Sequence, residues 1–117
     1  MNKKIASVEM KNIYTVYEAE EGYQVMQVKS KDDTGGRIED IELEVVEEVE
    51  KNLSEGSYDI EEIFSHLKSN SITNEWKYYY GRDGRHQKFY LRKILCVLIA
   101  LKRISWAKEG KKYIYTV

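Results

Sequence analysis

The sequence predicts an α+β protein, because stretches with the period of a strand and stretches with the period of a helix occupy different parts of the chain. β-Branched and aromatic residues alternate with polar ones over residues 12–29. Apolar residues recur every three or four positions over residues 60–67 and 91–101. Two short strand-like runs follow over residues 104–117. A chain of 117 residues is one domain, or a domain with a small appendage.

The first third of the chain predicts antiparallel strands. Residues 12–29 read as a β-hairpin whose short turn contains Gly22. A third strand is expected over residues 37–45, running into a helix at about Leu43. We therefore expect an acidic β-hairpin or three-stranded appendage over residues 1–42, followed by a separate domain over residues 43–117.

The clearest helix begins after Asp59. Asp59 and Glu62 have the spacing of a capping box, in which each side chain bonds to the other residue's backbone N–H. The apolar residues that follow lie on one face of the helix. They are Ile60, Ile63, Phe64 and Leu67. A short helix from Ser71 or Thr73 through Tyr80 is expected next.

The expected layout ends with a long helix from His86 to about Ile104 and a terminal hairpin over residues 104–117. The helix has an inner apolar stripe and a second apolar face that also requires a partner. The second face consists of Cys96, Val97, Ile99 and Ala100. The N-terminal hairpin or a second copy of the chain can cover it, and we expect a mixture in which a homodimer is favoured.

The net charge of −1 conceals two oppositely charged halves. Residues 1–62 contain 17 Asp and Glu against 7 Lys and Arg, whereas residues 63–117 contain 3 Asp and Glu against 12 Lys and Arg. Such an asymmetry is typical of a basic surface that binds a polyanion, most often nucleic acid. The alternative is that the two halves neutralise each other across an internal or dimer interface.

Residues 43–117 resemble the winged helix-turn-helix family. "DIEEIFSHL" resembles the second helix of the family, "FYLRKILCVLIALKRISW" the recognition helix with the first wing strand, and "KEGKKYIYTV" the wing. The resemblance implies duplex-DNA binding, with the recognition helix in the major groove and the wing on the neighbouring backbone. One departure is that about 16 residues, from Asn70 to Arg85, separate two helices that the family joins by a short turn.

The resemblance and the charges together predict a DNA-binding surface. Arg85, Lys88 and Arg92 share one face of the long helix, and the hairpin lysines extend it. The candidate DNA-binding residues are Arg82, Arg85, His86, Lys88, Tyr90, Arg92, Lys93, Lys108, Lys111 and Lys112. Six to eight phosphate contacts predict a log–log salt slope of roughly −5 to −7. The expected role is a small transcriptional regulator that binds as a homodimer.

Other functions are weaker predictions. A winged-helix module that binds proteins and not DNA is the main alternative, and the acidic half predicts a basic protein partner. A metal-dependent nuclease is a distant third, because Asp59 precedes the run Glu75-Trp76-Lys77. We expect no enzyme activity, no cofactor and no metal, since the sequence lacks a metal-ligand cluster and a phosphate-binding loop. The lone Cys96 and the absence of a signal peptide predict a cytoplasmic protein.

Overall fold

The computed structural model describes residues 2–76 and 84–117, which form an α+β fold of two antiparallel sheets and three α-helices. Its strands are β1 (Lys3–Glu9), β2 (Ile13–Ala19), β3 (Gly22–Val28), β4 (Arg37–Glu42), β5 (Ser57–Tyr58), β6 (Ser105–Glu109) and β7 (Lys112–Thr116). Its helices are α1 (Leu43–Lys51), α2 (Ile60–Ser69), the 3₁₀ turn η1 (Ile72–Glu75) and α3 (Arg85–Ala100). The α+β class predicted from the two periods is confirmed.

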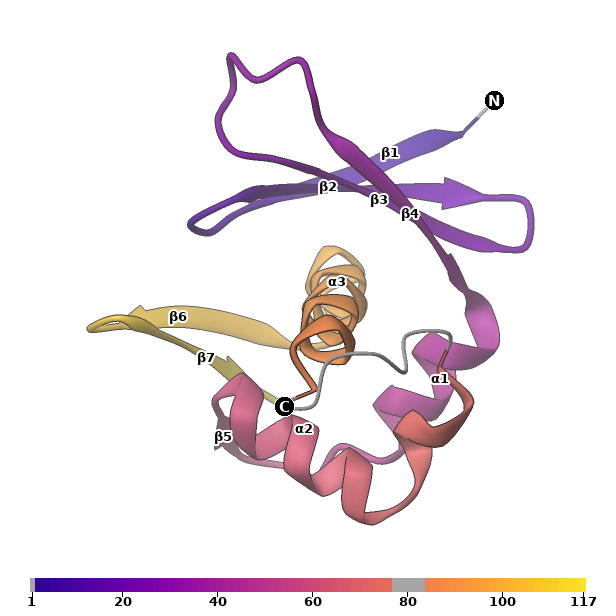
Figure 1. The fold of residues 1–117 in the computed structure, drawn as a ribbon, viewed down its shortest axis with the longest axis vertical. Helices are drawn as coiled ribbons and strands as arrows, with labels where there is room; N and C mark the ends of the chain where they lie inside the picture. The colour runs from indigo at the N-terminus through magenta and orange to yellow at the C-terminus, as the bar shows by residue number, and fades with distance from the viewer. Residues whose placement is uncertain (1, 77–83) are drawn as a thin grey trace.

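The elements form three layers, with α3 in the middle (Figure 1). The sheet with strand order β1-β2-β3-β4 lies on one side of α3. Helices α1 and α2 and the small sheet β5-β7-β6 lie on the other side. The two outer layers cover α3 from both sides. This arrangement therefore decides which of its charged side chains remain exposed.

One hydrophobic core joins the N-terminal sheet to α3. The sheet contributes Val16 and Val25, both fully buried, and α3 contributes Cys96 and Val97 from its second apolar face. The expected boundary between residues 42 and 43 falls between β4 and α1, and the core spans it. The N-terminal sheet therefore covers the second apolar face within one chain, so that face gives no reason to invoke a second copy.

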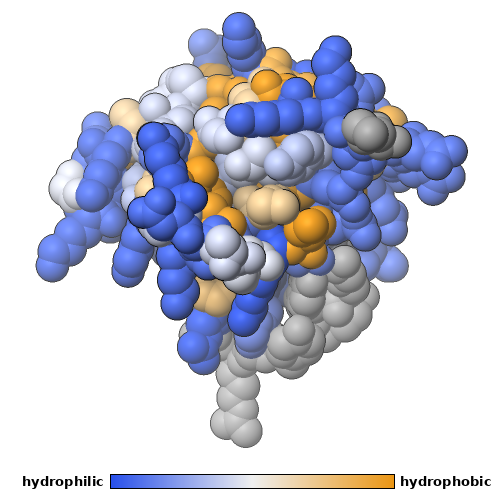
Figure 2. Space-filling view, turned by 90° about the horizontal axis from the view of Figure 1, so that it is seen from above, coloured by the Kyte–Doolittle hydropathy of each residue, from blue (hydrophilic) through white to orange (hydrophobic). Residues whose placement is uncertain are grey.

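The N-terminal sheet contains the predicted hairpin as β2 and β3, and the expected third strand as β4. Strand β1 was not predicted. It pairs with β2 through a register shift between Lys4 and Ala6, which interrupts the alternation that marks a strand in the sequence. Figure 2 shows the outer face of this sheet, where a pale and orange band is bordered by hydrophilic residues. Ile38 on β4 is 60% exposed.

Helix α2 begins with the predicted capping box, which is confirmed. The Glu62 backbone N–H donates to Asp59 Oδ1 at 2.9 Å, and the Asp59 N–H donates to Glu62 Oε1 at 3.1 Å. Two of the backbone donors at the helix start are satisfied in this way. The box fixes the position of Asp59, which also lines the candidate site described below.

Helix α3 begins one residue before the expected start and ends four residues before the expected end. Gly84 precedes it with φ 72°, and a Cβ on Gly84 would lie 2.7 Å from the Phe64 ring, so glycine suits both the backbone and the space. At the other end, Lys102 has φ 62° and the Arg103 N–H donates to the Leu98 carbonyl at 2.9 Å. This is the hydrogen bond of a Schellman motif, formed here without glycine.

The C-terminal hairpin is confirmed as β6 and β7, joined at Gly110 with φ 63°. Tyr115 is fully buried, and Trp106 and Tyr113 are half-buried with their rings 5.7 Å apart. The two-residue strand β5 was not predicted, and it pairs with β7. The expected short helix over residues 71–80 is only the turn η1 in its first part, and residues 77–80 lie outside the described residues.

Candidate nucleic-acid interface

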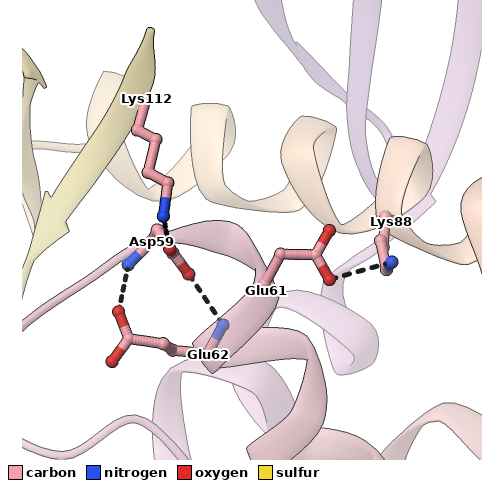
Figure 3. A network of polar contacts seen from close by, with 5 residues as sticks. All are labelled: Asp59, Glu61, Glu62, Lys88 and Lys112. Atoms are coloured by element: carbon pink, nitrogen blue, oxygen red, sulfur yellow. Dashed lines mark hydrogen bonds and ion pairs between the residues drawn. The ribbon is translucent and has the colours of Figure 1, made fainter. Parts of the chain in front are cut away.

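The open cationic face predicted on α3 is not present, and this expectation is wrong for two of its three residues. Lys88 Nζ lies 2.9 Å from the Glu61 carboxylate of α2 (Figure 3). It also lies 5.5 Å from the centre of the Phe64 ring. Arg92 is half-buried under Tyr113, 5.8 Å from the centre of its ring. Arg85 remains exposed on the first turn of α3.

Two further predicted DNA contacts are buried. Lys93 is 8% exposed, and its Nζ lies 3.4 Å from Glu39 Oε1 on the inner face of β4. Tyr90 is 5% exposed and packs edge-on against Trp76, with ring centres 5.3 Å apart. Burial, followed by the charge of Glu39, raises the pKa of Tyr90 to about 12, so the hydroxyl is neutral. Lys93 and Tyr90 are therefore structural groups and not surface contacts for DNA.

The other two predicted DNA contacts near the start of α3 are Arg82 and His86. Arg82 lies outside the described residues. His86 is half-buried on α3, with its ring centre 6.2 Å from that of Phe89, which is 52% exposed. Arg85, His86 and Phe89 thus lie in the first turns of α3, whereas Arg92 lies near the middle of the helix.

A basic groove lies between the β1–β2 turn and the hairpin β6–β7, which are both at the left of Figure 1. Lys11 belongs to the turn, and Lys108, Lys111 and Lys112 belong to the hairpin. The groove has two hollows, which share Lys11, Lys111 and Tyr113. This groove brings together the three predicted hairpin lysines and one lysine that the sequence did not point to.

The first hollow has a volume of about 630 Å³. It is lined by Glu9, Met10, Lys11, Trp106, Lys108, Lys111 and Tyr113. The second hollow has a volume of about 260 Å³. It is lined by Lys11, Asn12, Asp59, Ile60, Glu61, Arg92, Lys111, Lys112 and Tyr113. Cations with aromatic rings between them are a combination that suits nucleic acid, since lysines meet phosphates and flat rings pack against sugars and bases.

Each carboxylate in the groove already has a cation partner. Glu9 lies 3.6 Å from Lys31, and Asp59 Oδ2 lies 3.3 Å from Lys112 Nζ (Figure 3). Glu61 is paired with Lys88. In the described part of the chain, by contrast, Lys11, Lys108 and Lys111 have no carboxylate partner. The groove therefore presents an excess of positive charge to an incoming ligand.

Negative charge gathers at the opposite end of the N-terminal sheet. The β2–β3 turn and the junction of β4 with α1 form a hollow of about 740 Å³. Its acidic lining residues are Glu18, Glu20, Glu21, Glu42 and Glu44. The charge asymmetry of the sequence is thus also a separation in space, with the basic groove and this acidic end on opposite sides of Figure 1.

The structure gives no support to the nuclease arrangement. Asp59 is held by the capping box and by Lys112, and Lys77 lies outside the described residues. Among the residues that the structure describes, no group of three or more His, Cys, Asp or Glu side chains could hold a metal ion. Burial raises the pKa of the Cys96 thiol to about 12, so it is not a thiolate at neutral pH.

Comparison with known proteins adds no relative: no family model, no curated protein and no solved structure matches the chain. A search of the described helices found none long and apolar enough to cross a membrane. The site must therefore be interpreted from its own geometry and charge.

Proposed function

We propose that this chain binds duplex DNA through the basic groove and acts as a small transcriptional regulator. The observation that carries the proposal is the convergence of Lys11, Lys108 and Lys111 on one groove without carboxylate partners among the described residues. Two segments about 100 positions apart in sequence supply them. Phosphate contacts of this kind provide most of the affinity of a protein for DNA.

The order of elements over residues 43–117 supports a winged-helix variant. Helices α1, α2 and α3 are followed by a hairpin, as the resemblance implies. In this variant the hairpin and the β1–β2 turn meet the DNA backbone, because the N-terminal sheet covers much of α3. The acidic end of the molecule is repelled by DNA, which favours one orientation of the protein on the duplex.

A gel shift on duplex DNA at several salt concentrations tests the proposal. Three lysine–phosphate contacts predict a log–log salt slope of roughly −3, smaller in magnitude than the slope of roughly −5 to −7 expected for six to eight phosphate contacts. The triple variant Lys11→Glu, Lys108→Glu, Lys111→Glu is expected to bind at least about 100-fold more weakly at fixed salt. The three side chains are exposed, so circular dichroism should show an unchanged fold.

A charge-matched control separates the groove from net charge. The variant Lys3→Glu, Lys51→Glu, Lys68→Glu makes the same change in net charge at exposed positions on β1, α1 and α2. It is expected to lower affinity much less than the groove variant does, because its lysines lie outside the groove. Equal binding by the groove variant and the wild type would contradict the proposal.

The second candidate is a winged-helix module that binds a basic protein partner at its acidic end. The observation that favours it is the hollow around Gly22 with its five glutamates, together with Leu43, which is 40% exposed at its edge. No DNA binding by the wild type at low salt would favour this candidate over the first. The gel shift therefore discriminates between the two.

A further inference from the structure

The guanidinium of Arg92 lacks a counter-charge among the described residues. Its neighbours are the Tyr14 and Tyr115 hydroxyls, which hydrogen-bond to it, and the ring of Tyr113 at 5.8 Å. Its Nε is buried and has no hydrogen-bond partner. Among the described residues, Arg92 forms no ion pair with a carboxylate. A half-buried arginine is normally paired, because removing its charge from water is costly.

The tyrosines around Arg92 cannot supply the missing negative charge. Burial raises the pKa of the Tyr115 hydroxyl strongly and raises that of Tyr14 as well. Both hydroxyls are therefore neutral at physiological pH and provide only their dipoles. They hold the guanidinium in place without neutralising it.

Arg92 lines the second hollow of the basic groove, and Lys11, Lys111 and Lys112 line it as well. Each of the two carboxylates of this hollow is paired with a lysine (Figure 3). Asp59 accepts a hydrogen bond from the Glu62 N–H and pairs with Lys112, and Glu61 pairs with Lys88. The hollow therefore combines a fixed guanidinium that has no carboxylate partner among the described residues with lysines at its rim.

We propose that the second hollow binds a phosphate group, which provides the counter-charge that Arg92 lacks. A guanidinium presents a planar fork of donors that matches two phosphate oxygens, and the lysines Lys11 and Lys111 add point charges from the rim. The volume of about 260 Å³ admits a phosphate with bridging waters. In a DNA complex the ligand is a backbone phosphate, and this form of the inference rests on the proposed function; a free phosphate compound has the same chemistry.

Inorganic phosphate tests the site without DNA. Phosphate replaces chloride at constant ionic strength while thermal unfolding of the wild type is followed. At ten times its dissociation constant phosphate should raise the midpoint by about 5 °C, and beyond that concentration the midpoint should rise with the logarithm of the phosphate concentration. General salting-out raises the midpoint in proportion to the phosphate concentration, so the shape of the titration separates the two effects. A midpoint that rose only in proportion to the phosphate concentration would overturn the inference.

Variants locate the phosphate. Arg92→Lys keeps the charge but loses the fork, and we expect it to weaken phosphate binding about tenfold. Lys111→Gln is exposed, tests the rim without disturbing the core, and should also weaken binding. Lys68→Gln makes the same charge change outside the groove and should leave phosphate binding unchanged. Wild-type affinity in both Arg92→Lys and Lys111→Gln would place any phosphate elsewhere.

A gel shift of the same variants identifies the source of the phosphate. If it belongs to DNA, Arg92→Lys should weaken DNA binding about tenfold at fixed salt, as it weakens phosphate binding, and should leave the salt slope unchanged because the charge is kept. Unchanged DNA affinity of Arg92→Lys, with inorganic phosphate still bound by the wild type, assigns the site to a free phosphate compound. Lys108 lines only the first hollow, so Lys108→Gln should weaken DNA binding and leave inorganic phosphate binding intact. Failure of DNA binding alone thus leaves the phosphate site standing.

Discussion

Helix α3 and the hairpin β6–β7 carry cations of the same kind in different environments. Lys93 on α3 lies between two layers and pairs with Glu39, whereas Lys111 at the hairpin tip faces solvent. The first region is fixed by its neighbours and uses its charge to join α3 to β4. The second has charge available for a ligand. A basic residue therefore indicates binding only when the rest of the fold leaves it without an opposite charge.

The largest effect that tests this comparison is expected at Lys93. Lys93→Met removes the ion pair to Glu39, whose side chain is only 13% exposed, and should lower the free energy of unfolding by about 3 kcal/mol. Lys111→Met, in the open region, should change it by less than about 0.5 kcal/mol. Urea denaturation of the two variants at neutral pH measures both values.

A double variant shows whether the cost arises from the loss of the ion pair between Lys93 and Glu39. Lys93→Met combined with Glu39→Met removes both charges from the same interface and should recover most of the lost stability. If Lys93→Met alone were as stable as the wild type, the pair would not hold α3 to the sheet. The contrast between the two regions would then be one of exposure alone.

Local features of the fold could be predicted from the sequence. The capping box needs only Asp59 and Glu62, and the hairpin turn needs only Gly110 between two short runs. The end of α3 could not be predicted in this way. Its Schellman motif has Lys102 in the left-handed conformation, where glycine is the usual signal. Strand β5 forms by pairing with β7, which is far away in the sequence. A short stretch of sequence therefore does not reveal it.

The candidate site could be predicted only in part, for a related reason. Helical spacing places Lys88 and Arg92 on one face, but it does not reveal that Glu61 and the tyrosines occupy that face. Lys93 meets Glu39, which is 54 positions earlier in the chain, through the packing of the sheet on α3. Lys11 joins the hairpin lysines by the same packing. Residue type and spacing thus indicate the cations, and the tertiary structure decides which of them remain open.

A smaller effect is expected at Asp59, which links α2 to the hairpin through Lys112. Asp59→Ala removes the cap and should cost about 1 kcal/mol, whereas Asp59→Asn keeps a capping oxygen and should cost only a few tenths of that. The hydrogen bond from the Glu62 N–H, with a smaller contribution from Lys112, lowers the pKa of Asp59 below 3.8. Urea denaturation measures both variants.

The lowered pKa of Asp59 also sets the direction of a pH effect. A carboxyl whose pKa is lower in the folded state stabilises the fold fully above its unfolded pKa, and this contribution is lost as the pH falls through the folded pKa. The wild type should therefore lose its advantage over Asp59→Asn between about pH 5 and pH 2. A gap that stayed constant over this range would show that the ionised carboxylate adds nothing beyond the cap.

A small effect on stability is also expected at Lys88, which lies on α3 and pairs with Glu61 of α2. Its partner Glu61 is 64% exposed, and solvent screens a pair of this kind, so Lys88→Met should cost only about 0.5 kcal/mol despite the 2.9 Å contact. Because this small cost leaves the fold intact, the variant gives a clean reading of DNA binding. If Lys88 stays with Glu61 in the complex, the salt slope of Lys88→Met should equal that of the wild type. A slope smaller by about 1 would instead mean that Lys88 exchanges Glu61 for a phosphate, and α3 would then share the DNA backbone with the hairpin.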